Sequence, residues 1–374
     1  MISKILILIL LFSISGTVFS QEKPDTKYFI IFKDKGEFSP GEKITPGDKA
    51  YETGKSILSE RALIRRLKVL SEDELISFMD LPLEDSYVEG VKNSGVEIIT
   101  ISRWLNGVSA YLTEAQVKQL ENLDYVSHVK TVNKLFKQKE NSVSIEETLG
   151  DDTTGNRYDY GNSWKQMSTV NVPKVHNLNI TGKGVMIASF DDGFDWKNHE
   201  ALRNLNVTGE YDFINKDENT FAEKNQKYND SKNQGAHGTS TLSTMSGFKN
   251  GKLVSPAFDS EILLAKTEYV SSETPMEEDF WLEASEWAEA KGVDIVTSSL
   301  IYKKFDNPFE NNSYEYKDFN GRTALTSVAA ARLAYLGVVV CQAMGNYDQT
   351  TVPSLGSAAD ADSIISVGAI TFSG

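Results

Sequence analysis

The chain of 374 residues carries 38 basic and 53 acidic side chains, which gives a formal net charge of −15. Hydrophobic residues make up 40% and charged residues 24%, an ordinary globular composition that excludes a collagen-like or disordered chain. The acidic balance argues against nucleic acid as a partner, because such an interface needs clustered lysine and arginine. The single cysteine, Cys341, excludes an internal disulfide.

The N-terminus has the plan of a secretory signal. Lys4 precedes an unbroken apolar run, Ile5 to Phe12, and the stretch closes at Ser20 before charged residues begin. This apolar core is shorter than the roughly twenty residues that a membrane-spanning helix needs. The alternatives are an uncleaved anchor or a buried strand. We expect a signal peptide over residues 1–20, a secreted extracellular product, and no membrane partner after cleavage.

Residues 21–136 predict a small α+β module. Thr113 and Gln116 form a capping-box pattern at the start of its last helix. The expected strands are Tyr28–Phe32, Val96–Ile101, Trp104–Leu112 and Val126–Val132, and the expected helices are Ser59–Leu67, which is basic, Asp85–Asn93 and Glu114–Asn122.

A polar stretch, Lys137–Arg157, has no apolar period and is rich in turn-forming residues. It predicts an exposed linker over residues 137–160, and such segments are preferred sites of proteolytic cutting. We therefore expect the processing site there, and a second domain over residues 161–374.

In this second domain strands and helices alternate, which indicates an α/β fold with a doubly wound parallel sheet. Thr274 is the expected cap of one helix, and Gly337 ends another. The polar stretch from Asn204 to Gly235 is expected to be a surface excursion. The expected strands are Val185–Phe190, Ile262–Lys266, Asp294–Ser299, Val338–Ala343 and Ile364–Ala369, and the expected helices are Gly238–Ser246, Pro275–Lys291 and Ala324–Leu336.

Three polar residues stand where open α/β sheets place their sites, at strand ends or helix starts. Asp191 ends an apolar strand, His237 lies between small residues just before a helix, and Asn346 follows a buried strand. Each has an ordinary alternative: a turn after a strand, a structural histidine, or a Gly-Asn turn. An amide such as that of Asn346 can donate to a developing oxyanion without titrating.

Taken together in this order, the three segments resemble the subtilisin-like serine proteases, the subtilases. The resemblance makes Asp191 and His237 the triad aspartate and histidine and Asn346 the oxyanion-hole asparagine. Val293–Leu300 resembles the strand that pairs with substrate, and Ile364–Ala369 resembles a core strand. The front module resembles the subtilisin propeptide, a ferredoxin-like inhibitor and folding chaperone. The implied partners are protein or peptide substrates and the chain's own propeptide.

The chain departs from the family at the nucleophile. The family's serine lies in a Gly-Thr-Ser-Met-Ala segment well after the strand that Ile364–Ala369 resembles, and the printed sequence holds no such segment. We expect the sequence to be truncated, with the subtilisin-like domain incomplete at its C-terminus and the 374-residue chain inactive. The alternative is a non-catalytic relative that acts as a binding or inhibitor protein.

Substrate-binding residues follow from the same resemblance: Ser299, Leu300, Ile301 and Gly345. Ile301 replaces a usual glycine, which predicts a bulkier specificity pocket. Asp192 lies beside Asp191, and two adjacent buried carboxylates would raise one pKa. No cofactor and no metal ligand are expected. Structural Ca²⁺ is an option suggested by Asp195 and the acidic start of the 275–291 helix, although such acidic clusters are usually solvated.

Overall fold

The computed structural model describes residues 26–131, 155–346 and 355–370. The expected signal peptide lies outside these residues, as does most of the expected linker. In the described residues, none of the helices combines the length and apolar character required to cross a bilayer.

The N-terminal module is an antiparallel sheet in the order β2-β3-β1-β4, covered by two helices, α3 and α4. This strand order and the sequence β1-α3-β2-β3-α4-β4 define a ferredoxin-like fold. The capping box of Thr113 and Gln116 begins α4, as the sequence predicts. Its elements are β1 (Lys27–Phe32), α1 (Lys49–Ile57), α2 (Glu60–Arg66), α3 (Asp85–Asn93), β2 (Thr100–Ser102), β3 (Gly107–Tyr111), α4 (Glu114–Glu121) and β4 (Val126–Thr131).

Two strands of this module differ from the sequence prediction. The apolar residues that begin at Val96 do not start a strand there. Val96 packs in the module core, and β2 begins only at Thr100. The next strand begins at Gly107 instead of Trp104, since Asn106 has a φ of +52° and turns the chain between β2 and β3. Asn-Gly is a preferred pair for such a turn. Helix α1 was not predicted.

The second domain is built on a six-stranded sheet in the order β12-β11-β10-β5-β9-β6, with every pair parallel. Strand β5 (Met186–Asp191) is buried along its whole length, as expected for a central strand covered on both faces. The predicted doubly wound α/β fold is therefore confirmed. The other strands are β6 (Asn206–Asp212), β9 (Glu261–Lys266), β10 (Ile295–Ser298), β11 (Val339–Ala343) and β12 (Ile365–Val367), with a small hairpin of β7 (Phe248–Lys249) and β8 (Leu253–Val254).

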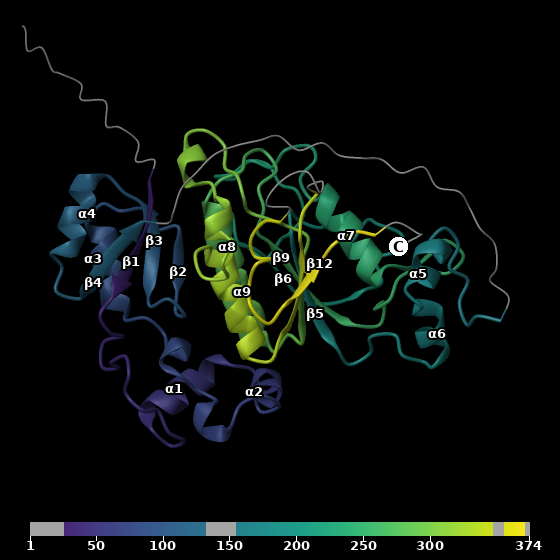
Figure 1. Cartoon of the computed structure of the whole chain (residues 1–374), viewed down its shortest axis with the longest axis horizontal. Coiled ribbons are helices and arrows are strands. Elements are labelled where there is room, and N and C mark those ends of the chain that lie inside the picture. Colours follow the sequence, from purple (N-terminus) through teal and green to yellow (C-terminus); the bar gives the residue numbers. More distant parts are fainter. Residues whose placement is uncertain (1–25, 132–154, 347–354, 371–374) are drawn as a thin grey trace, which may run out of the picture.

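Helices lie on both faces of this sheet (Figure 1). Helix α7 (Ala236–Ser246) packs on β5 from one face, while α8 (Met276–Lys291) and α9 (Leu325–Tyr335) cover the other. Figure 1 shows α8 and α9 between this sheet and the N-terminal module. Two short helices, α5 (Trp164–Thr169) and α6 (Val172–Asn177), precede β5 and were not predicted.

The expected surface excursion between Asn204 and Gly235 is wrong in its first part, because residues 206–212 form strand β6 and pair with β9. Its polar sequence reflects its position at the sheet edge, where one side faces solvent. The last residues of the expected linker are also packed: Tyr160 is fully buried and its ring stacks on His176. Thr274 contributes its backbone to the start of α8: its N–H donates to the Glu277 carboxylate and its carbonyl oxygen accepts from the Glu277 N–H, while Pro275 is the cap.

A buried ion triplet ties β6 and the loop after it to the central sheet. Lys266 at the end of β9 donates to Asp212 over 2.8 Å and to Asp230 over 2.7 Å, and all three side chains are at most 1% exposed. Removing the cation alone would leave two buried carboxylates unpaired, which is strongly destabilising.

We therefore expect Lys266→Ala to lower the free energy of unfolding by about 3 to 5 kcal/mol, measured by chemical denaturation. The control is Lys252→Ala, which removes an exposed pair with Glu200 and should cost less than about 1 kcal/mol. Equal losses in the two variants would contradict the structural role of the triplet.

Candidate active site

The C-terminal ends of the parallel strands lie together at one end of the sheet, which we call its carboxyl edge. The residues singled out in the sequence lie there. Asp191 is the last residue of β5, Ser299 follows β10, and Asn346 follows β11. Helix α7 begins beside the end of β5 and carries His237 as its second residue. Open α/β sheets bind ligands at this edge.

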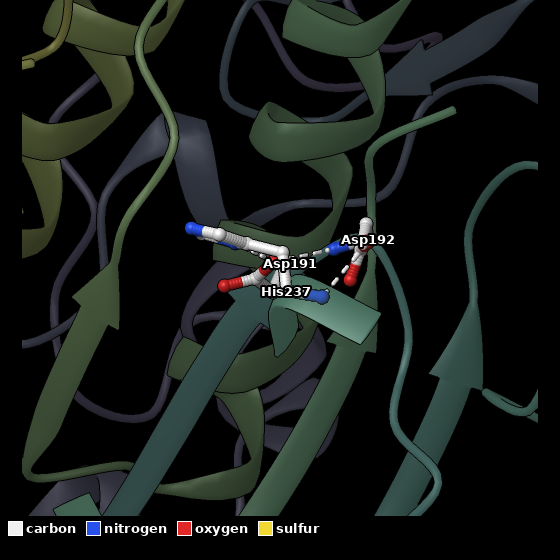
Figure 2. Close-up of side chains that lie close together, drawn as sticks. All are labelled: Asp191, Asp192 and His237. Atoms are coloured by element: carbon white, nitrogen blue, oxygen red, sulfur yellow. Dashed lines mark hydrogen bonds and ion pairs between the residues drawn. The ribbon is translucent and has the colours of Figure 1, made fainter. Parts of the chain in front are cut away.

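Asp191 and His237 form a direct pair, shown in Figure 2. His237 Nδ1 lies 2.6 Å from Asp191 Oδ1, and the second oxygen, Oδ2, accepts a hydrogen bond of 2.9 Å from Thr241 Oγ1. The Asp191 side chain is 1% exposed, whereas that of His237 is 54% exposed. A fixed, buried carboxylate thus holds one nitrogen of an imidazole whose other nitrogen remains available to a ligand.

The hydrogen bond that the His237 ring donates to Asp191 is the main cause that raises the pKa of His237 above its usual range, with the charge of Asp192 adding to it. Because the carboxylate occupies Nδ1, the proton of the neutral ring lies on Nδ1 and Nε2 is the basic atom. This is the tautomer that a general base needs.

Asp192 anchors the start of α7. Its Oδ1 accepts from the Gly238 N–H over 2.7 Å and its Oδ2 accepts from the His237 N–H over 3.3 Å, so it binds two amides that have no partner inside the helix. Burial, and then the neighbouring Asp191 charge, raise the pKa of Asp192 to about 6. The expectation that one of the two adjacent carboxylates has a raised pKa is confirmed.

Close packing also fixes α7 against β5. Gly193 and Gly235 both have positive φ angles, +118° and +80°, which permits the two tight turns that bring the strand end and the helix start together. A Cβ added at Gly238 would lie 2.2 Å from the Gly193 carbonyl oxygen and 2.9 Å from Asp191 Cβ. Only glycine fits at this position without moving the helix.

Thr241 and Gln234 are parts of the site that the sequence analysis missed. Gln234 is buried, and its amide donates to the Asp192 and Glu268 carbonyl oxygens over 2.6 and 2.7 Å. Thr241 lies one turn after His237 on α7, and this spacing is the only sequence signal that could have pointed to it. Nothing in the sequence distinguishes Gln234 from the polar residues around it.

The expected substrate-binding strand continues β10. Ser299 is exposed, Leu300 is buried and Ile301 is half-buried. The buried Gln342 of β11 donates to the Leu300 carbonyl oxygen and so holds this segment. A Cβ at Gly356 would lie 3.0 Å from Ile301 Cβ, so Ile301 fills its surroundings tightly.

Asn346 is exposed, and Gly345 before it has a φ of +106°. It follows the second strand over from β5, which is about 10 Å away at ordinary strand spacing. Within the described part of the chain, no hydrogen bond joins Asn346 to Asp191 or His237. The structure therefore brings Asp191 and His237 together and leaves Asn346 on the same sheet edge without direct contact.

Among the residues that the structure describes, two groups could hold a metal ion by distance: Asp191 and Asp192 with His237, and Glu268, Glu273 and Glu277. In the first cluster the hydrogen bonds described above already occupy most of the oxygens. The acidic start of α8 is not solvated as expected, since Glu277, Glu278 and Asp279 are all buried. Burial is the largest cause that raises the pKa of Glu268 and of Glu277 well above its usual range. Calcium stays a prediction without named ligands.

A cavity of the described structure lies away from the Asp191–His237 pair. That cavity, of about 760 Å³, lies between the N-terminal module and the second domain and is lined by residues such as Tyr111, Tyr228 and Phe280. Asp191 and His237 instead lie on an open sheet edge, as suits a site for an extended chain.

Comparison with known families identifies the family to which the chain belongs. The model of the subtilase family matches residues 182–374, and the model of the peptidase S8 propeptide domain of Bacteroidota matches residues 27–146. The chain belongs to the subtilase family. The N-terminal module of this subtilase is a propeptide domain, and the expectation drawn from the three polar segments is confirmed at the level of family and fold.

One solved structure, that of fervidolysin, supports the fold assignment. Fervidolysin from Fervidobacterium pennivorans, a keratinolytic enzyme related to subtilisin, is 15% identical with a TM-score of 0.50, and the match covers 92% of this subtilase and 43% of fervidolysin. Two structures of the epidermin leader peptide processing serine protease from Staphylococcus aureus are 16% identical, cover 77% of this chain and 68% of theirs, and have TM-scores of 0.49 and 0.48. No curated protein was found to match the chain.

We expect Asp191→Asn to lower the pKa of His237, because the carboxylate that favours the charged ring is lost. The measurement is an NMR titration of the imidazole signals of the four histidines. Asp195→Asn is the control, because in the described residues Asp195 forms no hydrogen bond or ion pair with His237, and it should leave the midpoint unchanged. An unchanged midpoint of the His237 titration in Asp191→Asn would contradict a hydrogen bond between Asp191 and His237.

Gly238→Ala should displace the start of α7, because the new Cβ would lie 2.2 Å from the Gly193 carbonyl oxygen in the turn after β5. We expect a stability loss of about 1 to 3 kcal/mol, typical of overpacking, together with the same fall in the His237 midpoint. Ser240→Ala, on the exposed side of α7, is the control. A wild-type His237 titration in Gly238→Ala would show that the glycine does not position the histidine.

Proposed function

We propose that this subtilase is the precursor of a secreted serine endopeptidase that hydrolyses peptide bonds in extracellular protein. The observation that carries the proposal is the 2.6 Å pair of buried Asp191 and half-exposed His237 at the carboxyl edge of the sheet. A fixed imidazole with a raised pKa and a free Nε2 is suited to take and return a proton. We assign the nucleophile to a serine downstream of the printed chain.

In this mechanism His237 Nε2 takes the proton of the serine hydroxyl as the serine oxygen attacks the substrate carbonyl carbon. Asp191 stabilises the imidazolium that forms and does not itself become protonated. The amide of Asn346 donates to the tetrahedral oxyanion. His237 then gives its proton to the leaving amine nitrogen as the peptide bond breaks, and water hydrolyses the acyl-enzyme by the same steps in reverse order.

The remaining site residues are assigned to substrate. Ser299, Leu300 and Ile301 would pair with the extended peptide on the acyl side of the bond that is cut, and Gly345 would line the first specificity pocket. The buried amide of Gln342 supports this assignment because it fixes the Leu300 carbonyl. The bulk of Ile301, where the family usually has glycine, favours a restricted pocket.

The propeptide completes the proposal. We assign residues 1–20 to a signal peptide, 21–136 to the propeptide, and 161–374 to a catalytic domain whose remaining part lies downstream. The segment 137–160 would be cut once the domain has folded. The family match to a propeptide domain over residues 27–146 supports this order.

The test uses a fluorophosphonate probe, which labels an activated serine covalently. We expect labelling of a gene product that includes the downstream serine segment, and none of the printed 374 residues. His237→Ala in the longer product should slow labelling by several orders of magnitude, since loss of the triad histidine in subtilisin lowers kcat by about 10⁶-fold. His128→Ala, an exposed histidine of the propeptide, is the matched control. A longer product that is folded but never labelled would favour a non-catalytic binding protein instead.

A further inference from the structure

Helix α2 of the propeptide lies against the C-terminal ends of two helices of the second domain. The last carbonyl groups of a helix have no partner inside it and carry the negative end of its dipole. In α8 and α9 these ends are followed by Gly292 and Leu336. Both ends therefore present acceptors that need donors from elsewhere.

Arginines of α2 supply these donors. Arg65, 2% exposed, donates to the carbonyl oxygen of Val293 over 2.8 Å, to that of Leu336 over 3.2 Å, and to both the backbone and the carboxylate of Glu289. Arg61 donates to the Gly292 carbonyl oxygen over 3.1 Å. One short helix thus caps the ends of α8 and α9 from outside their own domain.

Arg66 adds a buried ion pair to the same contact. Its guanidinium donates to both carboxylate oxygens of Glu289, over 2.9 and 2.8 Å, and to Asp80 over 2.8 Å. All three side chains are at most 1% exposed. Glu289 therefore receives charge-assisted bonds from two arginines, which are stronger than neutral ones.

The backbones also meet closely. A Cβ on Gly292 would lie 2.6 Å from Arg61 Cβ and 2.7 Å from the Ala62 nitrogen, and the Ser59 N–H donates to the Ala290 carbonyl oxygen over 2.8 Å. The contact is therefore built into the end of α8 rather than formed by long flexible side chains alone.

This contact adjoins that of the propeptide sheet, and the two meet at Glu289, whose carboxylate lies 3.6 Å from the guanidinium of Arg103 just after β2. Strand β2 contacts α8 one to two turns earlier, where Thr100 donates to Glu283 and Ser102 donates to Glu286. Helix α2 belongs to the segment inserted between β1 and α3, outside the ferredoxin-like core.

We propose that α2 is a second anchor of the propeptide, with the C-terminal ends of α8 and α9 as its partner surface, and that it sets how long the propeptide stays bound after the connecting chain is cut. The anchor acts through guanidinium donors to helix-end carbonyls and to Glu289. This proposal rests on the assignment of the N-terminal module as the propeptide and does not require peptidase activity.

The test cuts the full chain with an added protease. A recognition sequence for a site-specific protease is inserted within residues 137–157, the chain is cut, and dissociation of the two pieces is followed by size-exclusion chromatography over time. Arg61→Ala and Arg65→Lys should each speed dissociation about 10- to 100-fold, because charge-assisted bonds present only in the complex are lost. Lys68→Ala, exposed and just beyond α2, is the control and should dissociate at the wild-type rate.

Wild-type dissociation rates in both Arg61→Ala and Arg65→Lys would overturn the proposal, as would immediate separation of the cut wild-type chain. Arg61→Ala decides the matter if Arg65→Lys does not fold, because Arg61 is 31% exposed and its partner Asp294 keeps a bond from the Met186 N–H. The added protease supplies the cut, so failure of the proposed peptidase activity would leave this result interpretable.

Discussion

The arrangement of the whole molecule depends on the charge pairing of α8, a helix buried between the propeptide and the parallel sheet. Its carboxylates at Asp279, Glu286 and Glu289 would be costly to bury alone. Lys27 meets Asp279, Arg103 meets Glu286, and the arginines of α2 meet Glu289, so cations from the propeptide cover one face of the helix. The acidity of this helix is therefore matched to the module that precedes it in the chain.

The same helix links the propeptide to the site. Trp281 on its other face packs edge-on against Phe190 of β5, one residue before Asp191, and donates to Ser298 at the end of β10. The strands that present the histidine partner and the expected substrate segment thus rest on α8. A propeptide that caps and neutralises α8 therefore supports the layer on which the site is built.

The site itself is held by backbone amides and glycines more than by charge alone. Asp192 binds the first amides of α7, and Gly238 allows the helix to approach β5, so the backbone that carries His237 is fixed beside Asp191. Preorganisation of this kind lets a base act without rearrangement during the reaction.

The sequence by itself determined the fold class, because the alternation of strands and helices follows local rules, and its resemblance to the subtilases predicted the Asp191–His237 pair. The tertiary structure alone decided three things. The polar edge strand β6 was hidden in an apparent loop, since an edge strand needs no apolar run. The burial of the acidic start of α8 does not follow from the sequence, since the lysine that pairs with Asp279 lies 252 positions earlier in the chain. The sequence also does not predict the role of Gln234 or of the α2 arginines that cap α8 and α9. Their partners are backbone atoms that become neighbours only after folding.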